Sequence, residues 1–113
     1  MSSTNGKPTL LCVDDVPEML HAYRRAFKDV FNVITAMDPE QATIHAESAD
    51  VILSDWELQH CTARDFLMQF QHKPVVVVSG RPDKVKLDHA WLILSKPTEM
   101  SIIQEALQEA LGG

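Results

Sequence analysis

The sequence has few of the residues that build zinc, disulfide-stabilised or membrane-spanning proteins. Of its 113 residues only two are cysteines, Cys12 and Cys61, which stand far apart without a Cys-x-x-Cys pair. The five histidines show no spacing that is typical of a metal site. No apolar run approaches the roughly 20 residues of a membrane-spanning helix. We therefore expect no histidine-based metal site and no membrane association, and we expect both thiols to be reduced.

Positive charge is also scarce. The chain has 10 Lys and Arg against 16 Asp and Glu, a net charge of −6, so electrostatic binding to nucleic acid or to an anionic membrane is not expected. Residues 1–7 are polar and lack the apolar segment of a signal peptide. We expect these residues to be a disordered lead-in to a single domain, residues 8–113, and we expect a cytoplasmic location.

Short apolar runs alternate with segments of helical spacing along this domain. The runs expected to be strands are 9–13, 32–36, 51–54, 75–78 and 90–95. The segments expected to be helices begin near Asp15, Asp38, Thr62, Arg81 and Thr98. The helix starts at Asp15 and Thr62 are each indicated by an acidic residue three positions further on, Glu18 and Asp65. The fourth helix, from Arg81 to Asp88, is expected to have about two turns.

This alternation of strands and helices predicts a doubly wound α/β fold. Aliphatic strands that alternate with helices form a parallel sheet covered on both faces and wound with right-handed crossovers. We expect one five-stranded parallel sheet with the strand order 2-1-3-4-5.

Polar residues follow four of the predicted strands. Asp14 and Asp15 follow the first strand, Asp55 the third, Ser79 the fourth and Lys96 the last. The carboxyl ends of parallel strands lie along one edge, so these side chains are expected to meet. Carboxylates held close together need a raised pKa or a cation, and Mg²⁺ is commonly bound by one or two carboxylates.

A carboxylate, a metal ion, a hydroxyl and an ammonium group together suit phosphoryl transfer, with Asp55 as the nucleophile. Each residue also has a simpler explanation. Asp55 could merely end its strand, because Asp is common in turns. Asp15 could be a helix cap, Ser79 a turn residue and Lys96 a solvated lysine.

Four short segments carry a resemblance to a known family. They are LCVDD (11–15), LSDW (53–56), VSG (78–80) and LSKP (94–97). In this order at four strand ends, they resemble the receiver domain of two-component response regulators, a CheY-like domain of flavodoxin-like fold. The resemblance covers residues 8–111 and implies a cis peptide bond between Lys96 and Pro97.

The resemblance also implies a role for each site residue. Asp55 is the phosphoacceptor, Ser79 the switch hydroxyl, and Lys96 the lysine that contacts the phosphoryl group. Asp14, Asp15 and Asp55 bind Mg²⁺, together with the backbone carbonyl of Glu57. The Glu57 carboxylate is further expected to influence the water that hydrolyses the acyl phosphate, and hence its lifetime.

The implied function is that of a phosphorylation-dependent signalling switch rather than a turnover enzyme. A sensor histidine kinase or a phosphotransfer protein donates the phosphoryl group. The phosphoprotein, which can also phosphorylate and dephosphorylate itself, then changes its contacts with a downstream protein target or a fused output domain. The sequence leaves open whether the chain acts alone or comes from a larger regulator.

The sequence departs from the family in places that bear on this switch. The loop after Asp55 lacks the usual Pro and Gly, so we expect altered loop flexibility. Ile93 replaces the aromatic switch residue, with Trp91 on the same face of its strand. These departures, with the short fourth helix, keep open a receiver-fold interaction module that phosphorylation does not switch. A Mg²⁺-dependent phosphohydrolase is disfavoured, because residues 14–16 lack its Asp-x-Asp loop.

Overall fold

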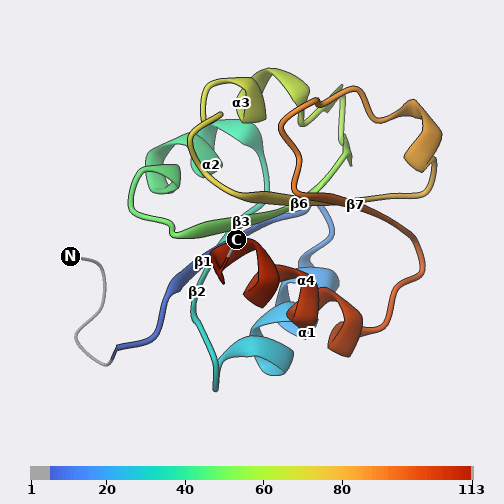
Figure 1. Cartoon of the computed structure of the whole chain (residues 1–113). Helices are drawn as coiled ribbons and strands as arrows, with labels where there is room; N and C mark the ends of the chain where they lie inside the picture. Colours follow the sequence, from blue (N-terminus) through green and yellow to red (C-terminus); the bar gives the residue numbers. More distant parts are fainter. Residues whose placement is uncertain (1–5, 113) are drawn as a thin grey trace.

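The computed structural model describes residues 6–112 as a parallel sheet between two layers of helices (Figure 1). The five strands of this sheet have the order β2-β1-β3-β6-β7. They are β1 (Thr9–Val13), β2 (Asn32–Ala36), β3 (Val51–Asp55), β6 (Val75–Ser79) and β7 (Leu92–Ser95). When these strands are counted along the chain, the order is the predicted 2-1-3-4-5, so the predicted fold class is confirmed.

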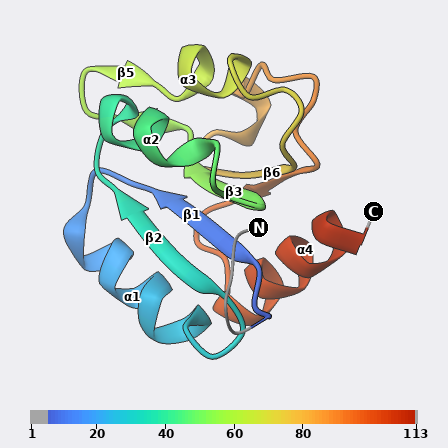
Figure 2. The same cartoon turned by 90° about the vertical axis from the view of Figure 1, so that its left-hand side faces the viewer.

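Helices cover both faces of the sheet (Figure 2). The helices are α1 (Pro17–Phe27) and α4 (Met100–Gly112) on one face, and α2 (Pro39–Ala46) and α3 (Arg64–Met68) on the other. Side chains of each strand alternate between the two cores: Leu11 packs beneath α2 and α3, and Leu10 packs against α1 and α4. Burial on both faces explains why the central strands are continuous aliphatic runs.

The predicted fourth helix is wrong. Over this fully described segment the structure has only a single 3₁₀ turn, η1 (Pro82–Lys84). Val85 and Leu87 are buried, whereas Lys86 and Asp88 between and after them are exposed. Alternation with a period of two residues favours an extended chain over a helix, so the β6–β7 connection crosses the sheet without a helix.

A two-stranded antiparallel hairpin, β4 (Glu57–Leu58) and β5 (Cys61–Thr62), follows β3 and was not predicted. Because Thr62 belongs to β5, it does not form the predicted capping box with Asp65, and α3 begins without a side-chain cap. His60 adopts the left-handed conformation, with φ 72°, at the turn. The loop without Pro or Gly is therefore an ordered hairpin; its altered flexibility stays a prediction.

The start of α1 also differs from the prediction. The residue before the helix is Val16, and no side chain caps the helix. The Asp15 carboxylate is thus not the cap, and the backbone N–H of Val16 donates instead to Asp14 Oδ1 (2.9 Å). This arrangement leaves the Asp15 side chain available at the sheet edge.

Other predictions concern the ends of elements and the thiols. The cap at Asp38 is confirmed, because its carboxylate accepts a hydrogen bond from the Gln41 N–H (2.8 Å). Both cysteines are free, Cys12 buried and Cys61 exposed. The last strand begins at Leu92 rather than at residue 90. Residues 1–5 of the predicted lead-in lie outside the described residues. Among the described residues, no helix is long and apolar enough to cross a membrane.

We expect the central strand β3 to be sensitive to loss of side-chain volume. Leu53 is fully buried, so Leu53→Ala should lower the free energy of unfolding by about 2–5 kcal/mol. Ile44 on α2 is 73% exposed, and Ile44→Ala is the control, with a change of about 0.5 kcal/mol or less. Urea unfolding measures both values. Equal losses in the two variants would contradict this packing.

Candidate functional site

Three carboxylates meet at the carboxyl edge of the sheet. Asp14 and Asp15 follow β1, and Asp55 is the last residue of the neighbouring strand β3. One carboxylate oxygen from each residue lies within 4.8 Å of those of the other two. The Asp14 and Asp55 residues are only 0% and 3% exposed, whereas Asp15 is half-buried. The structure thus brings together the acidic residues that the sequence placed at these strand ends.

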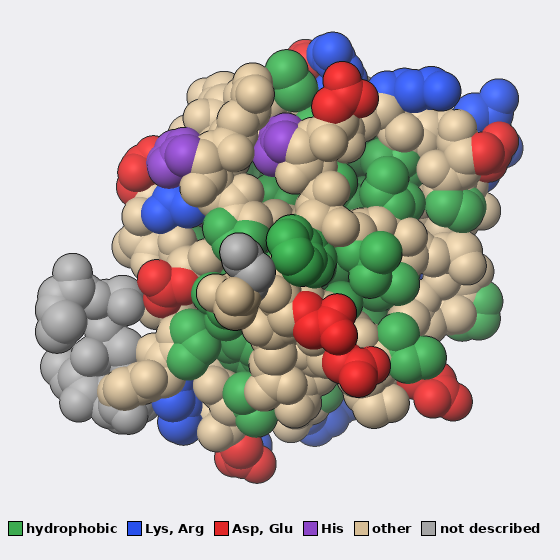
Figure 3. Space-filling model, viewed as in Figure 1, with side chains coloured by type: hydrophobic (Ala, Val, Ile, Leu, Met, Phe, Trp, Pro, Cys, Tyr) green, Lys and Arg blue, Asp and Glu red, His purple; other side chains and the backbone are tan. Residues whose placement is uncertain are grey.

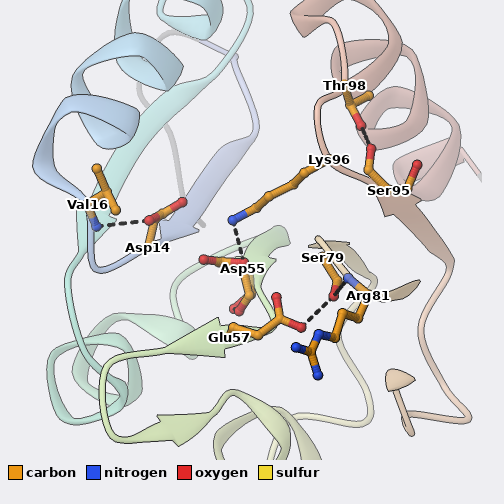
Figure 4. A network of polar contacts seen from close by, with 10 residues as sticks. Asp14, Val16, Asp55, Glu57, Ser79, Arg81, Ser95, Lys96 and Thr98 are labelled. Atoms are coloured by element: carbon orange, nitrogen blue, oxygen red, sulfur yellow. Dashed lines mark hydrogen bonds and ion pairs between the residues drawn. The ribbon is translucent and has the colours of Figure 1, made fainter. Parts of the chain in front are cut away.

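Lys96, the residue that follows β7, extends its side chain toward Asp55 of this cluster (Figure 4). Its Nζ lies 2.9 Å from Asp55 Oδ1, and its side chain is 38% exposed against 4% for Asp55. The backbone N–H of Lys96 donates to the Ser79 carbonyl (2.9 Å), which ties the end of β7 to the end of β6. The peptide bond between Lys96 and Pro97 is cis, as the resemblance implied.

Burial shapes the protonation of both buried acids. Burial raises the pKa of Asp55 to about 6; Lys96 opposes this rise, whereas Asp14 and Glu57 add to it. Burial also raises the pKa of Asp14. Asp14 Oδ2 is buried and has no hydrogen-bond partner among the described residues. A buried carboxylate oxygen without a donor is unfavourable, and a hard divalent cation would satisfy it. The three carboxylates therefore fit a metal ion such as Mg²⁺.

Ser79 lies at the same edge, but its hydroxyl already forms hydrogen bonds with other residues. The Ser79 Oγ–H donates to Glu57 Oε2 at 2.6 Å, and Ser79 Oγ accepts from the Arg81 N–H at 2.9 Å. Figure 4 shows the Glu57 carboxylate turned toward Ser79 and Arg81, with Asp55 on its other side. A bond of this length to a carboxylate is charge-assisted and strong. The Ser79 hydroxyl must leave Glu57 before it can donate to a group on Asp55.

This side-chain contact of Glu57 was missed by the sequence analysis, which assigned to Glu57 a backbone carbonyl and an effect on water. The hairpin sets the position of Glu57, because Glu57 pairs with Thr62 across β4 and β5. The sequence has no Gly, Pro, Asn or Asp between β4 and β5 that would predict this hairpin. Arg81 was also missed, although its place two residues after Ser79 could have drawn attention to its backbone N–H.

Ile93 on β7 and Trp91 just before that strand differ in burial. Ile93 is half-buried and packs against the core beneath α2 and α3. Trp91 precedes β7 and is 46% exposed. An aliphatic side chain thus occupies the sheet face at the position where the family has its aromatic residue.

Comparison with known proteins gives a likeness of fold. No protein-family model and no curated protein sequence matches the chain. A response regulator receiver domain protein from Clostridium thermocellum superposes with a TM-score of 0.83 at 22% identity, over 93% of this chain and 94% of that one. The chemotaxis response regulator CheY4 of Vibrio cholerae has a TM-score of 0.78 at 23% identity, over 93% and 99%.

The signal receiver domain of an HD domain-containing protein from Pseudomonas fluorescens Pf-5 has a TM-score of 0.82 at 20% identity, over 99% of this chain and 92% of that one. Two of these similar structures are receiver domains and the third is a chemotaxis response regulator, and each match covers nearly the whole of both chains. The chain therefore has the CheY-like fold of receiver domains.

Proposed function

We propose that the chain is a phosphorylation-dependent signalling switch in which Asp55 accepts the phosphoryl group. The observation that carries this proposal is the placement of a buried carboxylate between a cation and two further acids. Lys96 Nζ lies 2.9 Å from Asp55, and Asp14 and Asp15 lie within 4.8 Å of it. The likeness of the whole chain to receiver domains supports the same function.

The chemistry needs no base, because the nucleophile is a carboxylate. An Asp55 oxygen attacks the phosphorus atom, the P–O bond forms, and the P–N bond to the histidine of the donor breaks, leaving the imidazole. Lys96 neutralises charge on the transferred group. Ser79 donates its hydroxyl to a phosphoryl oxygen after it leaves Glu57. Mg²⁺, held by Asp14, Asp15, Asp55 and the Glu57 carbonyl, would neutralise further charge on the phosphoryl oxygens.

The partners follow from this function. The phosphoryl donor is a sensor histidine kinase or a phosphotransfer protein. The protein that responds to phosphorylation of this chain is a downstream target or a fused output domain. One structural neighbour belongs to an HD domain-containing protein, which supports a fused output domain. The chain is a phosphoacceptor with self-catalysed gain and loss of phosphate rather than a turnover enzyme. Reduced thiols and donors of this kind suit a cytoplasmic location.

Phosphorylation tests the proposal directly. With acetyl phosphate and Mg²⁺, the intact mass should increase by one phosphoryl group, because Asp55 is ionised near neutral pH. Asp55→Asn should abolish this increase, and EDTA should suppress it. As a matched control, Asp65→Asn changes an acid whose side chain is 99% exposed and should behave as the wild type. Phosphorylation of the Asp55→Asn variant, or none of the wild type, would refute the proposal.

A second candidate is a receiver-fold interaction module that phosphorylation does not switch. Aliphatic Ile93 and the missing helix between β6 and β7 favour it. Amide NMR with beryllofluoride and Mg²⁺ separates the two functions. A switch moves resonances of α4 and β7, whereas an unswitched module shows changes confined to residues around Asp55.

We expect the Glu57 carboxylate to restrain the Ser79 hydroxyl. Glu57→Gln removes the charge from this 2.6 Å hydrogen bond and from the surroundings of the phosphoryl group. The variant should therefore be phosphorylated by acetyl phosphate roughly five- to tenfold faster, since about 1–1.4 kcal/mol of charge-assisted bonding corresponds to this factor. Its dephosphorylation half-life should also change.

The control for this variant is Glu105→Gln on the exposed side of α4. Both rates of the control should equal those of the wild type. A Glu57→Gln variant with wild-type rates of phosphorylation and dephosphorylation would show that Glu57 does not restrain the site.

A further inference from the structure

The missing helix leaves a cavity between α3 and the β6–β7 connection. Its volume is about 550 Å³, within the range of small-molecule sites, roughly 300–1,000 Å³. Four apolar side chains contribute to its wall: Met68, Val85, Leu87 and Ile93. None of the residues proposed to act in phosphoryl transfer lines this cavity. It is therefore separate from the site at Asp55.

The charged residues that line this cavity are two cations and one acid. Arg64 and Lys86 line it, together with a single acid, Asp88. Arg64 is paired only loosely, 3.7 Å from the exposed Asp65, and such surface pairs hold a guanidinium weakly. No acid of residues 6–112 forms an ion pair with Lys86. Both cations are thus available to a ligand.

The cavity also lies in a part of the chain that is positively charged, in contrast to the rest. Residues 64–89 contain five Lys and Arg and three acids, whereas the remaining chain contains five Lys and Arg and thirteen acids. Figure 3 shows Lys and Arg side chains gathered at the upper right, over the β6–β7 connection. An anion approaching this acidic protein is attracted to this region and repelled elsewhere.

His89 adds a polar atom that has no partner. His89 Nε2 is buried and has no hydrogen bond to any described residue, and His89 lines the cavity. Burial lowers the pKa of His89, which favours the neutral imidazole, and Asp88 opposes this shift. A neutral imidazole nitrogen can donate or accept one hydrogen bond to a ligand.

We propose that this cavity binds a small organic anion, a carboxylate on an apolar body. The apolar body contacts Met68, Leu87 and Ile93, and the carboxylate lies between Arg64 and Lys86. The site does not depend on phosphorylation, so Asp55→Asn should bind the anion as the wild type does.

A matched set of naphthyl compounds tests this site by amide NMR on the ¹⁵N-labelled chain. 2-Naphthylacetate should give saturable shifts centred on Met68, Leu87 and Ile93. 2-Naphthylethanol should bind more weakly, and 2-naphthylethylamine weakest of all. Equal affinities for the three compounds would overturn the proposal, as would no binding. Shifts centred on the other cavity, between α1 and the start of α4 and lined by Met19 and Met100, would do the same.

Substitutions locate the charge. Lys86→Gln and Arg64→Gln should each raise the dissociation constant of 2-naphthylacetate about three- to fivefold. Asp88→Asn should lower it, because it removes the acid from the lining. Lys84→Gln is the control: it makes the same charge change in η1 but does not line the cavity. Equal losses for Lys84→Gln and Lys86→Gln would overturn the site and leave only a general effect of charge.

Discussion

The contact between Lys96 and Asp55 joins two strands that are not neighbours in the sheet. Asp55 ends β3, Lys96 follows β7, and β6 lies between them. The contact therefore depends on the strand order β3-β6-β7, in which every residue of β6 is buried. It also compensates a cost, because burial alone would make an ionised Asp55 unfavourable. The rest of the edge is arranged around this one charged carboxylate.

The acids and the hydroxyl at this edge are held in different ways. Asp14 is fixed by the backbone N–H of Val16, which leaves its other oxygen without a donor. Ser79 is fixed by Glu57 and by the N–H of Arg81. The unmade bond of Asp14 favours a cation, whereas the bond that Ser79 already makes opposes a phosphoryl group. Under the proposed function, a site with both features would be ready to bind metal, and the bond between Ser79 and Glu57 would oppose the phosphorylated arrangement.

The sequence was sufficient to predict the sheet and the acidic edge, because both depend on short-range patterns. Aliphatic runs that stop on Asp14, Asp55, Ser79 and Lys96 identify the strands and their ends. It was not sufficient for the connections. The β4–β5 hairpin has a histidine where turns usually have glycine, and the segment before β7 has a proline and charges that suit a helix start.

In the β6–β7 connection, the helix prediction overlooked a local signal: apolar Val85 and Leu87 alternate with charged Lys86 and Asp88, which is the period of an extended chain. Val85 and Leu87 are both buried in the core that α2 and α3 cover, and this requires an extended chain. Because this connection contains no α-helix, it also leaves the cavity beside Ile93. The position of the Glu57 carboxylate follows from the β4–β5 hairpin, which the sequence analysis also did not predict.

The pKa of Asp55 tests the central claim, that a buried carboxylate is held ready by a cation and two acids. Carboxyl ¹³C NMR over pH 3–8 should show Asp55 titrating near pH 6 without metal, against its ordinary 3.8. Since the folded value is higher than the unfolded one, protonation stabilises the fold as the pH falls through 6 toward 4. Mg²⁺ should lower the midpoint by about one unit or more. An Asp55 that titrates at its ordinary value without metal, or whose midpoint Mg²⁺ does not lower, would contradict the account.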